Sequence, residues 1–257
     1  LTTDGSGAVT FATAGGGGSP DLFAENYDGT STLPSATGTN AVAIGSSATA
    51  SGILGVSFGG GTASGDYSMS GGISSVASST HALALGRGTT ASGLGSLALG
   101  MGSNVNQGAV AAGTGSVALS KSYALGVDSF AASIANNTST YGANGANSVA
   151  MGNRAKASDG TSVAIGQDAT ASNGSYAVGL EAVASGTYSF AAGAATDATA
   201  AYTTALGRGA QATHQGATAI GYLAATTTTN QVSLGASGHT VRVSGAYNLP
   251  TADGTAN

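Results

Sequence analysis

Apolar residues along this chain fall into a recurring four-residue phrase, hydrophobic–Ala–hydrophobic–Gly. Clear copies are Val42-Ala43-Ile44-Gly45, Leu83-Ala84-Leu85-Gly86, Leu97-Ala98-Leu99-Gly100, Val149-Ala150-Met151-Gly152 and Val163-Ala164-Ile165-Gly166. Looser copies end at Gly59, Gly72, Gly113, Gly126, Gly179, Gly193, Gly207, Gly221 and Gly235. The phrase therefore marks one structural unit that is repeated down the chain.

The spacing of these glycines predicts the architecture. Neighbouring glycines recur with a nearly constant period, except that the interval between Gly126 and Gly152 is about twice as long as the others. We interpret this interval as two turns of ordinary length, of which the one around residues 127–147 has lost its motif but kept its length. A period of about fourteen residues that is so constant predicts a β-solenoid in which each repeat forms one coil.

Alternation within one repeat predicts two short strands. Successive side chains of a strand point to opposite faces, so Val163 and Ile165 share one face and Ala164 lies on the other. The following residues carry Ala169 and Ala171 on either side of Thr170, which we expect to face outward. Gly, Ser and Thr recur in every repeat and exclude a helix.

A coil this thin predicts association between chains. Ordering a residue costs about 1.5 kcal/mol, and a coil of some fourteen residues encloses few side chains, so a single roll is marginally stable. We expect the bulky face to fill the coil. The small-residue face, including Ala164, is then left as an uncharged strip that identical chains bury against one another. About fifteen coils at ~4.8 Å each give a rod about 70 Å long.

Composition shifts divide the chain into three parts. We expect a connector and cap over residues 1–39, which contain Pro20 and Pro34, and a β-roll over residues 40–225. Residues 226–257 are expected to hold neck-like strands and a C-terminal connector, because Thr240-Val241-Arg242-Val243 alternates with a period of two. The chain starts at Leu1 rather than Met, and we expect it to be part of a longer protein.

Composition and charge exclude several classes of function. The net charge is −5, and only 6 basic residues are spread along 257 positions, so the chain has no basic stripe for nucleic acid. No apolar stretch approaches the ~20 residues that a membrane-spanning helix needs. The chain has 44 glycines and no cysteine, but its apolar phrases stay in register, which opposes disorder.

Residues able to do chemistry are scattered. The three histidines, His81, His214 and His239, lie far apart, and the acids occur about once per repeat without forming a marked pair. Asp168 and Asp197 follow their glycines at different offsets, so they form no ladder of calcium ligands. We therefore expect neither catalysis, nor a cofactor, nor a metal site.

Three tyrosines stand at one position of the repeat. Tyr67, Tyr188 and Tyr202 hold the same offset before their glycines, and residues at the same offset stack in a solenoid. Exposed tyrosine is a common binding residue, because it offers area and a hydroxyl at a small entropic cost. These residues are therefore candidates for surface binding. The alternative is that they are partly buried turn residues that pack on neighbouring coils.

The phrase Asn147-Ser148-Val149-Ala150-Met151-Gly152, with its period and the Ala-x-Ala that follows, resembles the YadA-like head of trimeric autotransporter adhesins. It is also similar to the same head repeat in fibre proteins of tailed phages. The resemblance covers about residues 40–245. It implies a left-handed parallel β-roll, assembly of three chains around one axis, and a neck that resembles residues 229–235.

Departures from the adhesin pattern favour the phage fibre. The charged continuation of a bacterial neck is replaced by His239-Thr240-Val241-Arg242-Val243, no coiled-coil heptads follow, and Asp-Gly connectors stand near both ends. The resemblance then implies a non-enzymatic structural and adhesive segment of a virion appendage. Its partners would be two identical chains, neighbouring virion proteins and a host receptor or glycan. The alternative is a bacterial adhesin head at the cell surface that binds host matrix or cells.

Overall fold

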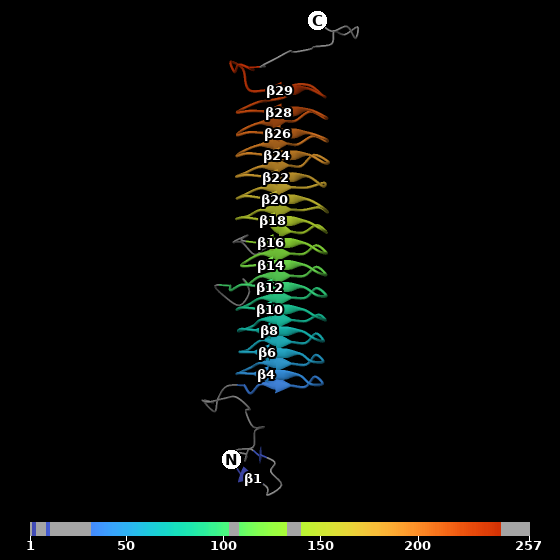
Figure 1. Cartoon of the computed structure of the whole chain (residues 1–257), viewed down its shortest axis with the longest axis vertical. Helices are drawn as coiled ribbons and strands as arrows, with labels where there is room; N and C mark the ends of the chain where they lie inside the picture. Colours follow the sequence, from blue (N-terminus) through green and yellow to red (C-terminus); the bar gives the residue numbers. More distant parts are fainter. Residues whose placement is uncertain (1, 4–8, 11–31, 103–107, 133–139, 243–257) are drawn as a thin grey trace.

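The chain forms a straight rod of stacked coils, each built from two short strands (Figure 1). This computed structural model describes residues 2–3, 9–10, 32–102, 108–132 and 140–242, and these contain strands and turns but no helix. Most of the predicted N-terminal connector and the tail after Arg242 lie outside the described residues. The predicted all-β solenoid is confirmed.

Two parallel sheets run the length of the rod. We call them sheet I and sheet II. Sheet I has 14 strands, stacked in chain order: β4 (Val42–Ile44), β6 (Val56–Phe58), β8 (Met69–Gly71), β10 (Leu83–Leu85), β12 (Leu97–Leu99), β14 (Val117–Leu119), β16 (Phe130–Ala132), β18 (Val149–Met151), β20 (Val163–Ile165), β22 (Tyr176–Val178), β24 (Phe190–Ala192), β26 (Thr204–Leu206), β28 (Thr218–Ile220) and β29 (Val232–Leu234).

Sheet II has 13 strands, which alternate along the chain with those of sheet I. They are β3 (Ser35–Ala36), β5 (Thr49–Ala50), β7 (Thr62–Ala63), β9 (Val76–Ala77), β11 (Thr90–Ala91), β13 (Val110–Ala111), β15 (Tyr123–Ala124), β17 (Gly142–Ala143), β19 (Lys156–Ala157), β21 (Thr170–Ala171), β23 (Val183–Ala184), β25 (Asp197–Ala198) and β27 (Gln211–Ala212). A separate antiparallel pair joins β1 (Thr2–Thr3) to β2 (Val9–Thr10).

The repeated phrase pairs with itself from one coil to the next. In sheet I, Ala150 lies opposite Ala164, flanked by the pairs Val149–Val163 and Met151–Ile165. In sheet II, Ala157 lies opposite Ala171. Because each coil uses its backbone groups to bind its neighbours, the fold needs little side-chain bulk to hold its register.

The long interval between glycines has a different origin from the one predicted. Leu97 pairs with Val117, and Phe130 pairs with Val149, so these two coils are several residues longer than the others. Gly113 and Gly126 belong to the turn after sheet II, where a Cβ on Gly113 would lie 1.9 Å from the Gly126 carbonyl oxygen. The predicted motif-free turn is therefore wrong. Two longer coils are present instead. Because glycine is frequent in both turns of a coil, the glycine spacing did not show that Gly113 and Gly126 belong to a different turn from the other glycines.

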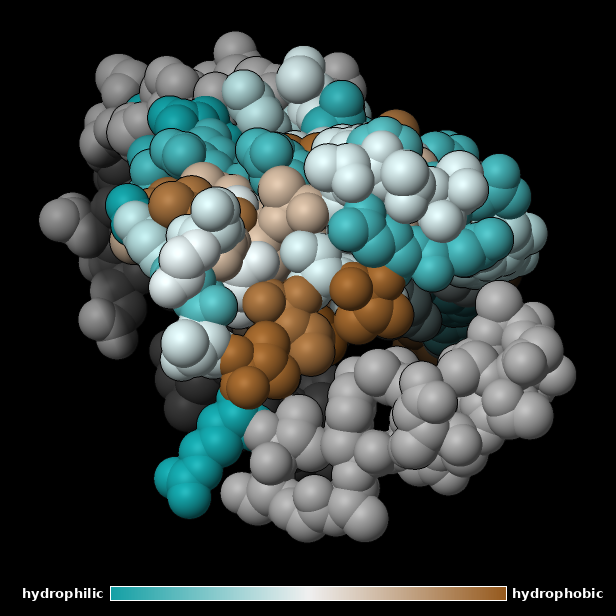
Figure 2. All heavy atoms as spheres, turned by 90° about the horizontal axis from the view of Figure 1, so that it is seen from above, coloured by the Kyte–Doolittle hydropathy of each residue, from teal (hydrophilic) through white to brown (hydrophobic). Residues whose placement is uncertain are grey.

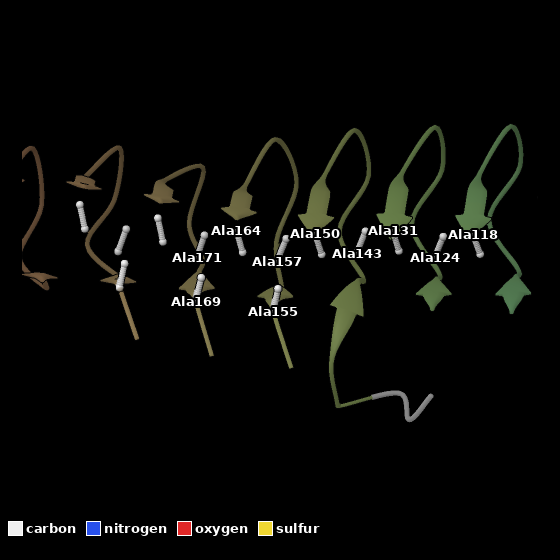
Figure 3. Packing of buried hydrophobic residues seen from close by; sticks show 14 of the residues in the cluster. Ala118, Ala124, Ala131, Ala143, Ala150, Ala155, Ala157, Ala164, Ala169 and Ala171 are labelled. Carbon is white, nitrogen blue, oxygen red and sulfur yellow. The ribbon is translucent and has the colours of Figure 1, made fainter. Parts of the chain in front are cut away.

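The interior of each coil holds only small side chains. Ala164, Ala169 and Ala171 are fully buried, as is the hydroxyl-bearing Ser162. Figure 3 shows Ala164 and Ala171 pointing into the space between the two sheets. The outward residues of sheet I are the bulky ones, and Ile165 is 37% exposed. The prediction that bulky residues fill the coil and that Ala164 faces another chain is wrong, because Ala164 is fully buried inside the coil while Ile165 lies on its outer face.

At several coils the glycine that ends the phrase is required by both backbone conformation and stacking, and Gly86 shows this most clearly. Gly86 has φ of +116°, which side-chain-bearing residues rarely adopt, and a Cβ there would lie 1.8 Å from the Gly100 carbonyl oxygen. This close approach brings each coil directly onto the next.

The roll extends beyond both predicted boundaries. At its start, Ser35 and Ala36 in β3 already pair with β5. At its end, β29 stacks in parallel on β28 and continues sheet I. The described residues 240–242 are not in a strand, so the alternation there does not give the separate strand that was predicted.

Candidate binding surface

The two sheets differ in the outer face that they present. Sheet I directs two columns of mostly bulky apolar side chains outward, and they run from Val42 and Ile44 to Val232 and Leu234. We call this surface the apolar strip. Sheet II directs outward a more polar column that includes Thr49, Thr62, Thr90, Lys156, Thr170, Asp197 and Gln211. Seen along the rod, many of the hydrophobic residues gather on one side (Figure 2).

A further column of residues, separate from those on the two sheets, runs along the turn that leads into each strand of sheet I. Its residues have φ between +52° and +71°, and we call it the left-handed column. Most of their backbone N–H groups donate to the coil before, as Tyr202 N does to Thr187 O at 2.8 Å. Its members are Asn40, Leu54, Tyr67, His81, Gly95, Gly115, Asp128, Asn147, Thr161, Gly174, Tyr188, Tyr202, Gly216 and Asn230.

The three predicted tyrosines all lie in the left-handed column, where neighbouring rings stack. The ring centroids of Tyr188 and Tyr202 are 6.3 Å apart, and those of Tyr67 and His81 are 5.1 Å apart. Tyr67, Tyr188 and Tyr202 are 53%, 68% and 59% exposed, so these turn residues pack on neighbouring coils but keep most of their surface open. The stacking predicted from equal offsets is found for Tyr188 and Tyr202, whereas Tyr67 lies far from them along the rod. A binding role for these residues stays a prediction.

Some of the turns that follow strands of sheet I carry charged and aromatic pairs that the sequence analysis missed. Arg154 Nε donates to Asp168 Oδ1 at 2.5 Å, and Arg154 Nη2 donates to Asp168 Oδ2 at 2.6 Å. This pairing lowers the pKa of Asp168 and raises that of Arg154. Further along, the Arg208 guanidinium lies 5.6 Å from the Tyr222 ring centroid. The sequence could have predicted these pairs, because the two members of each pair stand one repeat of 14 residues apart.

The titratable side chains of the described residues are scattered along the rod. Among the described residues, no group of three His, Asp or Glu side chains is placed to hold a metal ion. Burial raises the pKa of Asp197, which stands on sheet II between Val183 and Gln211. His81 and His239 instead stack on Tyr67 and Tyr222. No helix in the described part of the chain is long and apolar enough to cross a membrane.

A family model of the YadA head domain repeat matches residues 36–62, 63–88, 77–103, 143–169, 172–196 and 198–224. The chain belongs to the YadA head-repeat family. The matches to this YadA-type head omit the region of the two longer coils, where the spacing departs from the repeat.

One solved structure similar to this YadA-type head is the collagen-binding domain of the Yersinia adhesin YadA. It is 22% identical in sequence, and the alignment covers 85% of this chain and 93% of that domain, with a TM-score of 0.31. No curated protein matches the chain.

Proposed function

We propose that this chain is a non-enzymatic structural and adhesive segment of a homotrimeric phage tail fibre or other virion appendage, and that it contributes to attachment to a host cell. The observation that carries the proposal is the apolar strip of sheet I. Membership of the YadA head-repeat family supports both a trimer and an adhesive role. The Asp-Gly connectors near both ends, and residues 239–243 in place of a charged neck, support the fibre.

The small interior of the coil supports association between chains, and family membership supports three of them. One alanine methyl contributes far less to stability than a buried Val, Leu or Ile, which is worth about 1.5–3 kcal/mol. The larger side chains of each coil, such as Val163 and Ile165, instead lie on the outer face of sheet I. Three copies that bring this strip to a common axis supply the apolar core that a single roll lacks. The contact is thus made by the bulky face and not by Ala164.

A bacterial surface adhesin head is the second candidate, because head repeats of this family give the same roll. It would bind host matrix or cells at the end of a stalk. The segment encoded after Asn257 distinguishes the two. An outer-membrane anchor identifies the bacterial adhesin, whereas a fibre tip or a self-cleaving chaperone domain identifies the fibre.

Two measurements test the proposal on the purified chain. Multi-angle light scattering is expected to give three times 24.0 kDa. The trimer is also expected to compete with the whole particle for adsorption to host cells. A stable folded monomer at micromolar concentration contradicts the assembly, and a trimer that never reduces adsorption contradicts the adhesive role.

A further inference from the structure

Side chains in the left-handed column lean over the coil that precedes their own. A Cβ placed on Gly174 would lie 3.1 Å from Tyr188 Cε1, and a Cβ on Gly115 would lie 2.3 Å from Asp128 Oδ1. The Tyr202 ring stacks on the Tyr188 ring of the preceding coil. Within the column, the outer face of a ring is therefore covered by the side chain of the following coil.

Gly216 is the residue that follows Tyr202 in the left-handed column. Gly216 has no side chain that could pack on the Tyr202 ring, so no residue of the column covers the outer face of this ring. The next member, Asn230, leans over Gly216, because a Cβ on Gly216 would lie 2.3 Å from Asn230 Oδ1. The column thus leaves an open level between the Tyr202 ring and the Asn230 amide.

The same arrangement occurs a second time near the other end of the rod. Tyr67 and His81 stack, and the next member of the column is Gly95. A Cβ on Gly95 would have no neighbouring atom within 4 Å, so this level is open as well. Both stacked pairs of rings in the left-handed column are therefore followed by a glycine, so the column leaves one aromatic face of each pair uncovered.

The open level beside Tyr202 has the height of one flat ring. Coils stack at about 4.8 Å, so the levels of the Tyr202 ring and the Asn230 side chain are about 9–10 Å apart. Van der Waals contact needs about 3.5–4 Å on each side of an inserted ring. One ring therefore fits between them, and two do not.

The chemistry around this level is polar and uncharged. Gln215 precedes Gly216 and is exposed, and the equivalent positions in the coils on either side are Ala201 and Thr229. Amides, hydroxyls and the phenol can exchange hydrogen bonds with hydroxyl groups. The described turn residues here bring no carboxylate or ammonium group that would select a charged ligand.

We propose that Tyr202, Gly216 and Asn230 form a binding site for a neutral pyranose ring of a glycan. A pyranose with equatorial substituents presents C–H groups on its faces and hydroxyls at its edge. The C–H face can pack on the uncovered Tyr202 ring, and the hydroxyls can form hydrogen bonds with the side-chain amides. The proposal rests on the attachment role and assigns it a ligand class. Each trimer would carry three copies of the site. It could therefore bind a glycan-covered surface with avidity even if each single site is weak.

Binding of cellotetraose and chitotetraose to the purified trimer of the whole chain, measured by saturation-transfer NMR and calorimetry, tests the site. The wild type is expected to bind one of them, and Tyr202→Ala is expected to weaken binding at least tenfold. Tyr202→Phe, which keeps the ring, should stay within about threefold. Tyr222→Ala is the matched control, because Tyr222 is an exposed tyrosine on the opposite turn of the coil.

Gly216→Asn supplies an independent test that removes no aromatic group. Asparagine tolerates the left-handed conformation and already occupies it at Asn230. Its Cβ would displace the flexible end of the Asn230 side chain, so the fold should persist while the added amide fills the open level. Loss of sugar binding with an unchanged trimer supports the site.

Three results overturn the site. One is no binding of either oligosaccharide by a trimer that still reduces host adsorption, a result that leaves the proposed function standing. A second is binding of a proline-rich peptide in place of the sugars. The third is a Tyr202→Ala chain that no longer forms trimers, because the column would then belong to the contact between chains. A trimer that binds sugar but never affects adsorption contradicts the attachment role instead.

Discussion

Single positions in this fold have narrow requirements, because every coil repeats the same close contacts. The buried hydroxyls illustrate how these are met. Ser148 Oγ donates to Gly145 O at 2.6 Å, and Thr203 Oγ1 donates to Ala200 O at 2.7 Å, so each closes the turn just before its strand. An inward position therefore accepts a methyl group or a hydroxyl that reaches its own turn, and little else.

Replacing Ala164 by Arg should disrupt the coil itself. The site is fully buried between two sheets, so overpacking costs about 1–3 kcal/mol and an unpaired buried charge costs several more. Thermal unfolding by circular dichroism should show a large loss of stability, with local proteolysis near β20. Thr170→Arg, on the outer face of sheet II, should change stability by no more than about 0.5 kcal/mol. Equal melting temperatures for the two variants would contradict the assigned interior.

Gly86→Ala should be among the most damaging single-methyl changes in the chain. Its backbone conformation disfavours any side chain, and the new Cβ would collide with Gly100 O, so we expect a loss of about 2–5 kcal/mol. Gly59→Asn is the control, because Gly59 has φ of +52° and a Cβ there meets no atom within 4 Å. Denaturant unfolding of the two variants checks this, and a mild effect at Gly86 would show that coils stack less closely than described.

Two aspartates should affect the pH dependence of stability in opposite directions. Burial raises the pKa of Asp197 in the folded state, so its charge destabilises the fold above the ordinary Asp pKa of about 3.9. Asp197→Asn should therefore raise the melting temperature at pH 7, and the gain should disappear as the pH falls below about 3.9.

Asp168 provides the opposite case. Its pKa is lowered mainly by the hydrogen bond with Arg154, so its contribution is present at neutral pH and is lost as the pH falls through the lowered value. Asp168→Asn should lower the melting temperature at pH 7 and have no effect in strong acid. The same sign for both variants at pH 7 would contradict these environments.

At the level of elements, one coil behaves as a module. Neighbouring coils contact each other through paired strands in both sheets, and stability in such a stack is close to a sum of repeat and interface terms. The two longer coils show that extra residues in a turn do not alter strand pairing, because Leu97–Val117 and Phe130–Val149 keep the register of the sheet.

Deleting residues 149–162 should leave a folded, shorter rod. This segment is one full repeat, because Val163 occupies the register of Val149, and the new junction Ser148-Val163 reproduces the sequence Ser-Val on both sides. Far-UV circular dichroism should stay β-rich, and the rod should shorten by about 4.8 Å in small-angle scattering. Deleting only residues 149–155 should abolish cooperative unfolding, since strands of sheet I would then face those of sheet II.

The whole molecule has an amphipathic cross-section. Its interior is alanine with small hydroxyl residues, sheet II is predominantly polar outside, and sheet I carries the apolar strip along the rod. A surface this long and apolar is typical of a buried interface. Assembly and folding are therefore expected to be coupled, so the stability of the chain should depend on its concentration.

Ile165→Arg should weaken assembly without overpacking the interior of the coil. Ile165 lies on the strip and is directed away from the coil interior, so the arginine reaches the proposed axis in three copies. Light scattering should show a loss of trimer, while the coil itself retains room for the residue. This result differs from that of Ala164→Arg, which should damage the coil. If Ile165→Arg stays trimeric with an unchanged melting temperature, the strip is not the contact between chains.

Much of the fold could be read from the residues alone. A short and nearly constant period, alternation within Val163-Ala164-Ile165 and the recurring glycine led to a parallel solenoid of two-stranded coils. Equal offsets in the repeat also placed Tyr188 next to Tyr202, because in a solenoid spacing along the chain becomes height along the axis. The ladder of Arg154 and Asp168 could have been found in the same way.

Other features were decided only by the tertiary structure. Alternation separates a bulky face from a small one, but it does not say which face turns inward. The distance between the two sheets settles that, and it admits only residues such as Ala164 and Ala171. Likewise, the open faces of Tyr202 and His81 depend on which way side chains lean between coils. A glycine in the chain marks a turn, and only stacking of the coils shows what that glycine leaves uncovered.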